Sequence, residues 1–134
     1  GGHPYIEHPI KVSGMVHGRA AKIVALLHDV CEDSDVTLED LREAGFRARI
    51  VKAVDAVTKR KGERYRHYML RVRANRLATR VKIADATHNS DYSRISDYSE
   101  EDKKRSERYI NTIMFLKMPK RKLKHYTIEK PPID

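Results

Sequence analysis

The stretch His28-Asp29-Val30-Cys31-Glu32-Asp33 predicts both the fold and the place where chemistry happens. On a helix, residues four apart share a face, so His28 would stand over Glu32 and Asp29 over Asp33. Residues 23–27 (IVALL), just before the stretch, are all apolar, which is typical of a helix buried on every side. Buried carboxylates are costly unless a cation compensates them, and a metal ion is a compact way to do so. We therefore expect a metal site at the end of a buried helix.

Two distant segments offer further metal ligands. His8 precedes Pro9, which restricts its backbone between an extended segment and a helix start. Asp85 follows three apolar residues at helical spacing, Leu77, Val81 and Ala84, and so points at or beside the core. His8, His28, Asp29 and Asp85 form a nitrogen and oxygen donor set that suits manganese, iron or zinc. Separate helices can aim such ligands at one point in a bundle.

Five motifs in order resemble the HD superfamily of metal-dependent phosphohydrolases, and within it the alarmone hydrolase branch of Rel/SpoT hydrolase domains and small alarmone hydrolases. They are PYIEHP (4–9), ALLHDVCED (25–33), TLED (37–40), VTK (57–59) and KIADATHN (82–89). The resemblance runs from about residue 2 to about residue 95. It implies an all-α, single-domain HD helical bundle, and it makes His8, His28, Asp29 and Asp85 the metal ligands.

The same resemblance implies roles for other residues. Glu32 and Asp33 become the catalytic acid pair that handles the hydrolytic water. Asn89 becomes a substrate contact, and Tyr5 and Lys59 lie in matching motifs and are predicted to bind substrate too. The implied reaction removes pyrophosphate from the 3′ position of guanosine alarmones and gives GDP or GTP, with Mn²⁺ as the favoured metal and Fe²⁺ or Zn²⁺ as alternatives.

The chain also departs from the family pattern. The family normally has a helix and a basic residue before its Gly-x-Pro-Tyr segment, whereas this chain begins at Gly1 without methionine, so we expect that helix to be missing. Ala86 and Cys31 stand where the family has a larger residue and a valine. Neither belongs to the predicted ligand set, but both bear on substrate preference. Another phosphorylated nucleotide, such as NADPH, is therefore an alternative substrate.

A basic surface supports a different class of function. The chain has 134 residues and a formal net charge of +9. Ten lysines or arginines between Lys59 and Lys82 face one acid, Glu63, and Tyr65 and Tyr68 are available for stacking. An RNA-binding module is the resulting alternative. We favour a small phosphorylated nucleotide over nucleic acid as the partner, because an RNA-binding surface has no use for buried metal ligands. In the hydrolase, basic side chains of this stretch would hold the distal phosphates, with arginines favoured, although the sequence does not show which ones. Neutralising Arg71 and Arg73 would test this use of the stretch.

Composition fits one domain of ordinary globular character, with 40% hydrophobic and 35% charged residues. No apolar run reaches the roughly 18 residues of a membrane span, and the single cysteine fits a reducing cytoplasm. We divide the chain into an HD phosphohydrolase domain, 1–118, and a basic C-terminal tail, 119–134, expected to be irregular and peripheral. The oligomeric state does not follow from the sequence.

The pattern of apolar residues, caps and glycines predicts helices throughout. They cover residues 9–17, 19–30, a short helix between Thr37 and Gly45, 46–58, 65–74, 75–88 and a long helix capped by Ser99-x-x-Asp102 that stops before Pro119. The last helix would dock through an apolar face: Tyr109, Ile110, Ile113, Met114, Phe115 and Leu116.

Simpler explanations exist for each candidate residue. His28 and Asp29 could be a hydrogen-bonded core pair, and His8 a helix-entry residue packed on Tyr5. Asp85 could be an ion partner of Lys82 or Arg80. Glu32 and Asp33 could begin a loop, and Asn89 could be a helix C-cap. His88 is the histidine we expect to brace the site from outside the ligand set.

Overall fold

The computed structural model describes residues 7–92 and 99–131, and within these ranges it contains helices and no strand. The elements are α1 (Glu7–Gly14), α2 (Arg19–Leu27), α3 (Val30–Asp33), α4 (Leu38–Glu43), α5 (Ala48–Val57), α6 (Tyr65–Arg73), α7 (Arg76–Tyr92), α8 (Glu100–Lys117) and the 3₁₀ helix η1 (Lys120–His125). The predicted all-α fold is confirmed.

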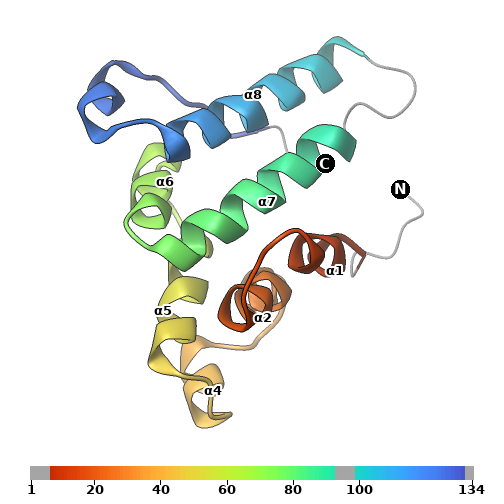
Figure 1. Ribbon diagram of the computed structural model, residues 1–134, viewed down its shortest axis with the longest axis vertical. Helices are drawn as coiled ribbons and strands as arrows, with labels where there is room; N and C mark the ends of the chain where they lie inside the picture. Colours follow the sequence, from red (N-terminus) through yellow and green to blue (C-terminus); the bar gives the residue numbers. More distant parts are fainter. Residues whose placement is uncertain (1–6, 93–98, 132–134) are drawn as a thin grey trace.

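Helix α7 lies at the centre of the bundle. It packs against α1, α2, α5, α6 and α8, and α1 and α2 also pack on each other (Figure 1). Side chains from most of these helices meet in one fully buried core, which includes Val12, Val24, Val54, Val81 and Phe115. A residue on α7 can therefore meet side chains from several other helices, which is what a site built from distant segments requires.

The predicted helix starts at Thr37 and Ser99 are confirmed as reciprocal capping boxes. The Asp40 N–H donates to Thr37 Oγ1 at 3.1 Å, and the Thr37 N–H donates to Asp40 Oδ2 at 2.9 Å. Ser99 and Asp102 repeat the arrangement at the start of α8. Gly45 follows α4 with a φ of 95°, a conformation that glycine adopts at little cost. These local signals were readable because each involves residues three apart.

The predicted continuous helix over residues 19–30 is wrong, because α2 ends at Leu27 and a turn at residues 28–29 precedes α3. The His28 ring donates from Nδ1 to the Ala25 carbonyl, the acceptor that another helical turn would offer to the Asp29 N–H. Two other helix ends also differ. Helix α1 ends at Gly14 rather than 17, and α7 continues to Tyr92 rather than 88.

The expectation of an irregular, peripheral tail after Pro119 is only partly correct, because residues 120–125 are helical whereas residues 126–131 have no regular secondary structure. The tail forms η1 and buries Leu123 and Ile128 against the core. The Arg66 guanidinium fixes it by donating to the carbonyls of Tyr126 at 2.6 Å and Leu123 at 2.7 Å. The apolar residues that anchor the tail are single residues among many lysines, so the sequence shows little of the pattern. The division at residue 118 remains a prediction.

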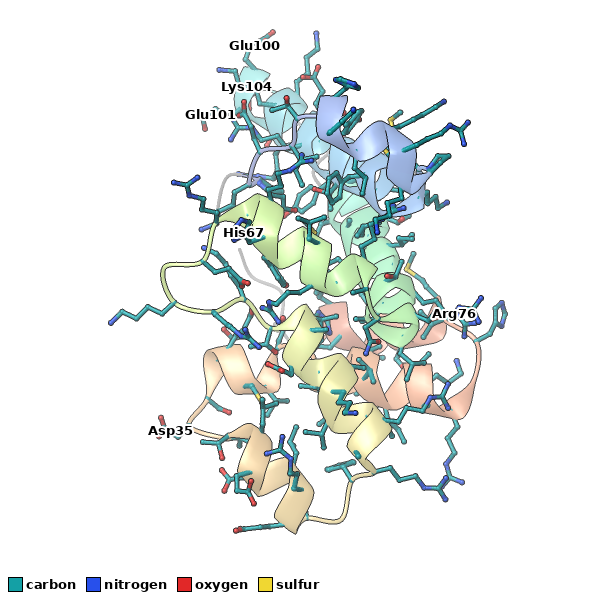
Figure 2. All side chains as sticks on the ribbon, turned by 90° about the vertical axis from the view of Figure 1, so that its left-hand side faces the viewer. Asp35, His67, Arg76, Glu100, Glu101 and Lys104 are labelled. Atoms are coloured by element: carbon teal, nitrogen blue, oxygen red, sulfur yellow. The ribbon has the colours of Figure 1, made fainter. Side chains whose placement is uncertain are left out.

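The long helix α8 docks through part of the predicted face. Phe115 and Leu116 are buried, whereas Ile110 is 36% exposed and Met114 is 50% exposed. Charged side chains elsewhere project outward, as Asp35 and Arg76 do in Figure 2.

In the part of the chain that the structure describes, every helix is too short or too polar to cross a bilayer.

Candidate metal centre

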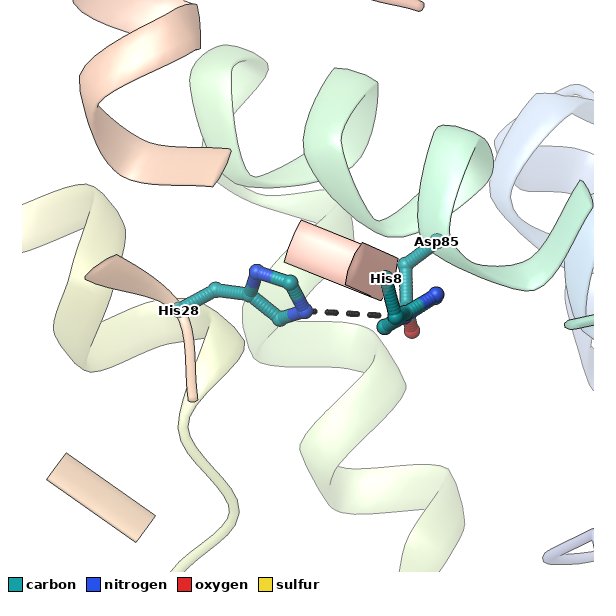
Figure 3. A group of neighbouring side chains, drawn as sticks. All are labelled: His8, His28 and Asp85. Carbon is teal, nitrogen blue, oxygen red and sulfur yellow. Dashed lines mark hydrogen bonds and ion pairs between the residues drawn. The ribbon is translucent and has the colours of Figure 1, made fainter. Parts of the chain in front are cut away.

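Three of the predicted ligands converge from three different parts of the bundle. His8 lies on α1, His28 directly follows α2, and Asp85 lies on α7 (Figure 3). One potential ligand atom from each residue lies within 4.8 Å of the other two. His28 and Asp85 are buried and His8 is half-buried. The structure thus brings together residues separated by up to 77 positions in a group that could hold a metal ion.

His28 presents one ring nitrogen to this cluster. Its Nδ1 donates to the Ala25 carbonyl at 2.5 Å, which leaves the lone pair on Nε2. Nε2 lies 3.4 Å from Asp85 Oδ1 and 3.3 Å from Asp29 Oδ2. Among the described residues, neither His28 Nε2 nor Asp29 Oδ2 has a hydrogen-bond partner, although both atoms are buried. A cation between these two buried atoms would give each of them a partner.

Asp29 lies at the edge of the cluster. Its carboxylate faces His28, but it does not share the tight grouping of His8, His28 and Asp85. Its side chain is 16% exposed, and burial raises the pKa of its carboxyl above the ordinary value, although His28 opposes the shift. Asp29 is therefore positioned as a more peripheral donor than the other three.

The carboxylates and histidines of the cluster shift one another's pKa values. Burial opposes protonation of His28, yet the negative charges of the nearby Asp85 and Asp29 carboxylates raise its pKa to about 8. Burial would also raise the pKa of Asp85, but Lys82 and the two histidines hold it well below its usual value. Carboxylates that recruit a proton onto a neighbouring imidazole can also recruit a divalent ion to the same place.

His88 lies where bracing was expected. Its Nδ1 is 2.5 Å from Nδ1 of His8, and the two rings stack with centroids 4.7 Å apart. The opposite nitrogen of His8, Nε2, lies 2.5 Å from Asp85 Oδ1. Because one edge of the His8 ring contacts His88, the other edge is directed at the cluster.

Lys82 is a member of the site that the sequence suggested only as an alternative partner for Asp85. Its Nζ lies 3.2 Å from Asp85 Oδ2 and 5.3 Å from the centre of the Tyr68 ring, and its side chain is 17% exposed. The two oxygens of Asp85 therefore have different partners: Oδ2 faces Lys82, and Oδ1 faces the histidines. Asp85 is thus an ion partner of Lys82, as the simpler explanation proposed. Its Oδ1 still faces the histidines, so the ion pair is compatible with a role as a metal ligand.

Glu32 and Asp33 lie on α3 rather than in a loop. Glu32 Oε1 accepts a 2.8 Å hydrogen bond from the backbone N–H of Lys59, 27 residues later in the chain. Although the residue as a whole is exposed, desolvation raises the pKa of its carboxyl, opposed by this hydrogen bond and by Lys82. Asp33 is exposed. Among the described contacts, Glu32 is therefore the one acid of the pair whose side chain bonds a distant segment, the loop between α5 and α6.

The predicted substrate contacts have different outcomes. Asn89 lies one turn after Asp85 inside α7, so it is not a helix C-cap, and its Nδ2 is 3.4 Å from Asp85 Oδ1. Lys59 contacts Glu32 through its backbone, and its side chain is half-buried. Tyr5 lies outside the described residues. The roles of all three as substrate contacts remain predictions.

Several members of the basic stretch are used inside the protein. Arg66 binds the tail, Arg73 donates to the carbonyls of Phe115 and Leu116, and Arg71 forms a two-pronged ion pair with Glu63. Arg71 and Arg73, the two arginines chosen to test phosphate binding by this stretch, are therefore bonded within the protein. Tyr68 is 5% exposed and Tyr65 bonds Thr112, so this pair does not form the open stacking platform of the RNA hypothesis.

The Glu63–Arg71 pair predicts acid-dependent stability. Hydrogen bonds from Arg71 lower the pKa of Glu63 from 4.5 to about 2. A lowered folded-state pKa stabilises the protein above the unfolded-state value, and the contribution is lost as pH falls from about 4.5 towards 2. We expect Glu63→Gln to cost on the order of 2 kcal/mol at neutral pH, with the gap from wild type narrowing on acidification.

Urea denaturation at several values between pH 7 and pH 3 measures this gap. Glu39→Gln is the matched control, because Glu39 pairs with Arg42 where both side chains are more than half exposed. A gap that stays constant with pH, or equals that of the control, would contradict the assigned ion pair.

The fold and the buried histidine and aspartate cluster together define a helical protein with a candidate metal centre. No protein-family model matches the chain. Among curated proteins it is 34% identical, over 103 residues covering 66% of this chain, to a "guanosine-3′,5′-bis(diphosphate) 3′-pyrophosphohydrolase" of Haemophilus influenzae. It is 36% identical over 99 residues, again 66% of the chain, to the zebrafish (Danio rerio) protein named "guanosine-3′,5′-bis(diphosphate) 3′-pyrophosphohydrolase MESH1".

A further relative, from Myxococcus xanthus, is named "GTP pyrophosphokinase" and is 31% identical over 120 residues, 76% of the chain. The resemblance drawn from the motifs is confirmed: this chain belongs to the alarmone hydrolase branch of the HD superfamily. The chain spans only 15% of the length of the Haemophilus and Myxococcus relatives and 54% of the zebrafish one.

Proposed function

We propose that this protein is a metal-dependent hydrolase that removes the 3′-pyrophosphate of guanosine 3′,5′-bis(diphosphate), or of its 5′-triphosphate counterpart, to give GDP or GTP. The observation that carries the proposal is the cluster of His8, His28 and Asp85, in which His28 Nε2 is buried without a hydrogen-bond partner. Two relatives of the chain, from Haemophilus influenzae and zebrafish, carry that activity in their names. The part of the proposal that depends on the relatives is the substrate. The cluster itself supports metal-assisted hydrolysis.

His8, His28 and Asp85 would hold the ion, and Asp29 would complete the set. Two imidazoles and two carboxylates suit Mn²⁺ best among the metals considered, and they also suit Fe²⁺ or Zn²⁺. When bound, such an ion would lower the pKa of a coordinated water and offset negative charge on a phosphoryl group. Positioning the water and recognising the substrate are left to the side chains of the protein.

Glu32 is the group we propose to position the attacking water. Its raised pKa makes it a better proton acceptor than an ordinary glutamate, and its bond from Lys59 fixes one carboxylate oxygen. Water attacks the phosphorus attached to the ribose 3′ oxygen, and the bond between that phosphorus and the 3′ oxygen breaks. The water gives up a proton, the 3′ oxygen gains one, and pyrophosphate leaves intact. Asp33 is proposed to assist from its exposed position on α3.

Substrate recognition is proposed to involve Asn89, Lys59 and Tyr5. Asn89 is placed beside Asp85, where a ribose or base next to the metal could meet its amide. The half-buried Lys59 side chain belongs to the loop that holds Glu32 and is proposed to meet a phosphate. The alarmone is a small phosphorylated nucleotide, and we place its hydrolysis in the cytoplasm, which suits a chain with one cysteine.

Product analysis tests the proposed reaction. With Mn²⁺ and guanosine 3′,5′-bis(diphosphate), phosphorus NMR should show GDP and pyrophosphate as the first products. Orthophosphate as the initial product would contradict 3′-pyrophosphate removal. Faster turnover of NADPH under matched conditions would reassign the substrate within the same class of hydrolase.

A further inference from the structure

Arg71 is bonded to the connection between α5 and α6 at several points. Its Nε and one terminal nitrogen donate to the two carboxylate oxygens of Glu63 at 2.7 and 2.8 Å. The same terminal nitrogen donates to the Thr58 carbonyl at 2.9 Å, and the other donates to the Asp55 carbonyl at 3.0 Å. One guanidinium thus joins the end of α5 to the far side of the loop.

The Thr58 carbonyl belongs to the same peptide group as the Lys59 N–H, and that N–H donates to Glu32 Oε1 at 2.8 Å. A trans peptide is planar, and its oxygen and hydrogen point in opposite directions. When Arg71 fixes the oxygen, it therefore also fixes the direction in which the hydrogen points. A charged donor on the carbonyl further polarises the peptide and strengthens the bond that its N–H makes.

We infer that Arg71 is a positioning residue, which orients the Thr58–Lys59 peptide so that its N–H holds one carboxylate oxygen of Glu32 in a fixed place. This replaces a direct phosphate contact as the role of Arg71. The catalytic consequence rests on the proposed function, whereas the link from Arg71 to Glu32 is a property of the folded chain.

A matched control lies two residues away on the same helix. Arg73 also donates from a half-buried position to backbone carbonyls, those of Phe115 at 2.9 Å and Leu116 at 3.3 Å. Arg73→Met removes a comparable guanidinium from α6 but leaves the Thr58–Lys59 peptide untouched. A general loss of stability should therefore affect both variants, and loss of positioning should affect only Arg71→Met.

The first readout is the Lys59 amide in proton–nitrogen NMR of the metal-free protein. Its hydrogen bond to a carboxylate predicts a downfield proton, and Glu32→Gln should move it upfield, which calibrates the effect. Arg71→Met should move it in the same direction, and Arg73→Met should leave it in place. An unchanged Lys59 amide in folded Arg71→Met would overturn the inference.

The second readout separates positioning from phosphate binding. With Mn²⁺ saturating, Arg71→Met should lower kcat for the alarmone by about 10-fold or more and leave KM within about 2-fold. Arg71→Lys keeps the charge but cannot form the fork, so it should behave like Arg71→Met. It also serves as the test variant if Arg71→Met does not fold. A raised KM with unchanged kcat, or full rescue by lysine, would show a phosphate contact instead.

These results distinguish the two claims. If the wild-type protein does not hydrolyse the alarmone, the proposed function fails, and the Lys59 amide still decides whether Arg71 orients the peptide. If the wild type is active and Arg71→Met has the same kcat as Arg73→Met, the proposed function stands and the positioning role fails.

Discussion

The variant His28→Ala is expected to bind no metal and to hydrolyse alarmone at background rate. His28 is the residue that faces both Asp29 and Asp85, with an unpartnered Nε2 between them. Alanine removes that donor and leaves two buried carboxylates without the imidazole that offsets their charge. The remaining residues would surround an incomplete site, so the variant should not retain Mn²⁺.

Thermal denaturation with and without Mn²⁺ measures this loss. A ligand that binds only the folded state stabilises it, by about 2.7 kcal/mol at 100 times its Kd, so the wild-type Tm should rise with added metal. His28→Ala should have a lower Tm and show no such rise. His17→Ala is the control, because His17 is exposed and lies after α1, away from the cluster. Equal metal-induced shifts in wild type and His28→Ala would contradict the assigned site.

The second large effect is expected from the acid pair. Glu32→Gln combined with Asp33→Asn should retain metal and substrate binding while hydrolysis falls by about 100-fold or more. Glutamine keeps an oxygen for the Lys59 N–H, so the loop contact survives, but it cannot accept the proton of the attacking water. Most of the loss should already appear in Glu32→Gln, since Glu32 is the acid that the fold holds in place.

Single-turnover hydrolysis and metal titration of the two single variants and the double variant separate the possibilities. Loss of metal in step with activity would make these acids ligands. Unchanged activity in all three would make them surface residues of α3. Asp40→Asn provides a control acid, because Asp40 is exposed and its carboxylate caps α4.

Much of the site was predictable because short motifs contain its polar residues, and because helical periodicity indicates which residues face the core. The convergence of His8, His28 and Asp85 was expected from the resemblance and from the apolar face around Asp85, and their proximity is observed. His88 was expected to brace the site from outside the ligand set, and it contacts His8. Helix starts at Thr37 and Ser99 were readable because capping boxes are local.

What the sequence did not reveal depends on long-range backbone contacts. The helix break after Leu27 coincides with a bond from the His28 ring to the Ala25 carbonyl, and hydrophobic periodicity does not show such a bond. Arg66, Arg71 and Arg73 looked like a phosphate-binding surface because charge alone does not show which guanidinium bonds a carbonyl of a distant element. The bond from the Lys59 amide to Glu32 has no sequence signal either, because every residue other than proline carries that donor.

Metal uptake by the wild-type protein tests the central claim most directly. Protein purified without chelator, then equilibrated in turn with Mn²⁺, Fe²⁺ and Zn²⁺ and freed of excess ion, is measured for bound metal per chain. The cluster of His8, His28, Asp29 and Asp85 predicts one ion per chain, with His17→Ala unchanged and His28→Ala empty. A wild-type protein that neither contains nor takes up any of the three metals would contradict the account.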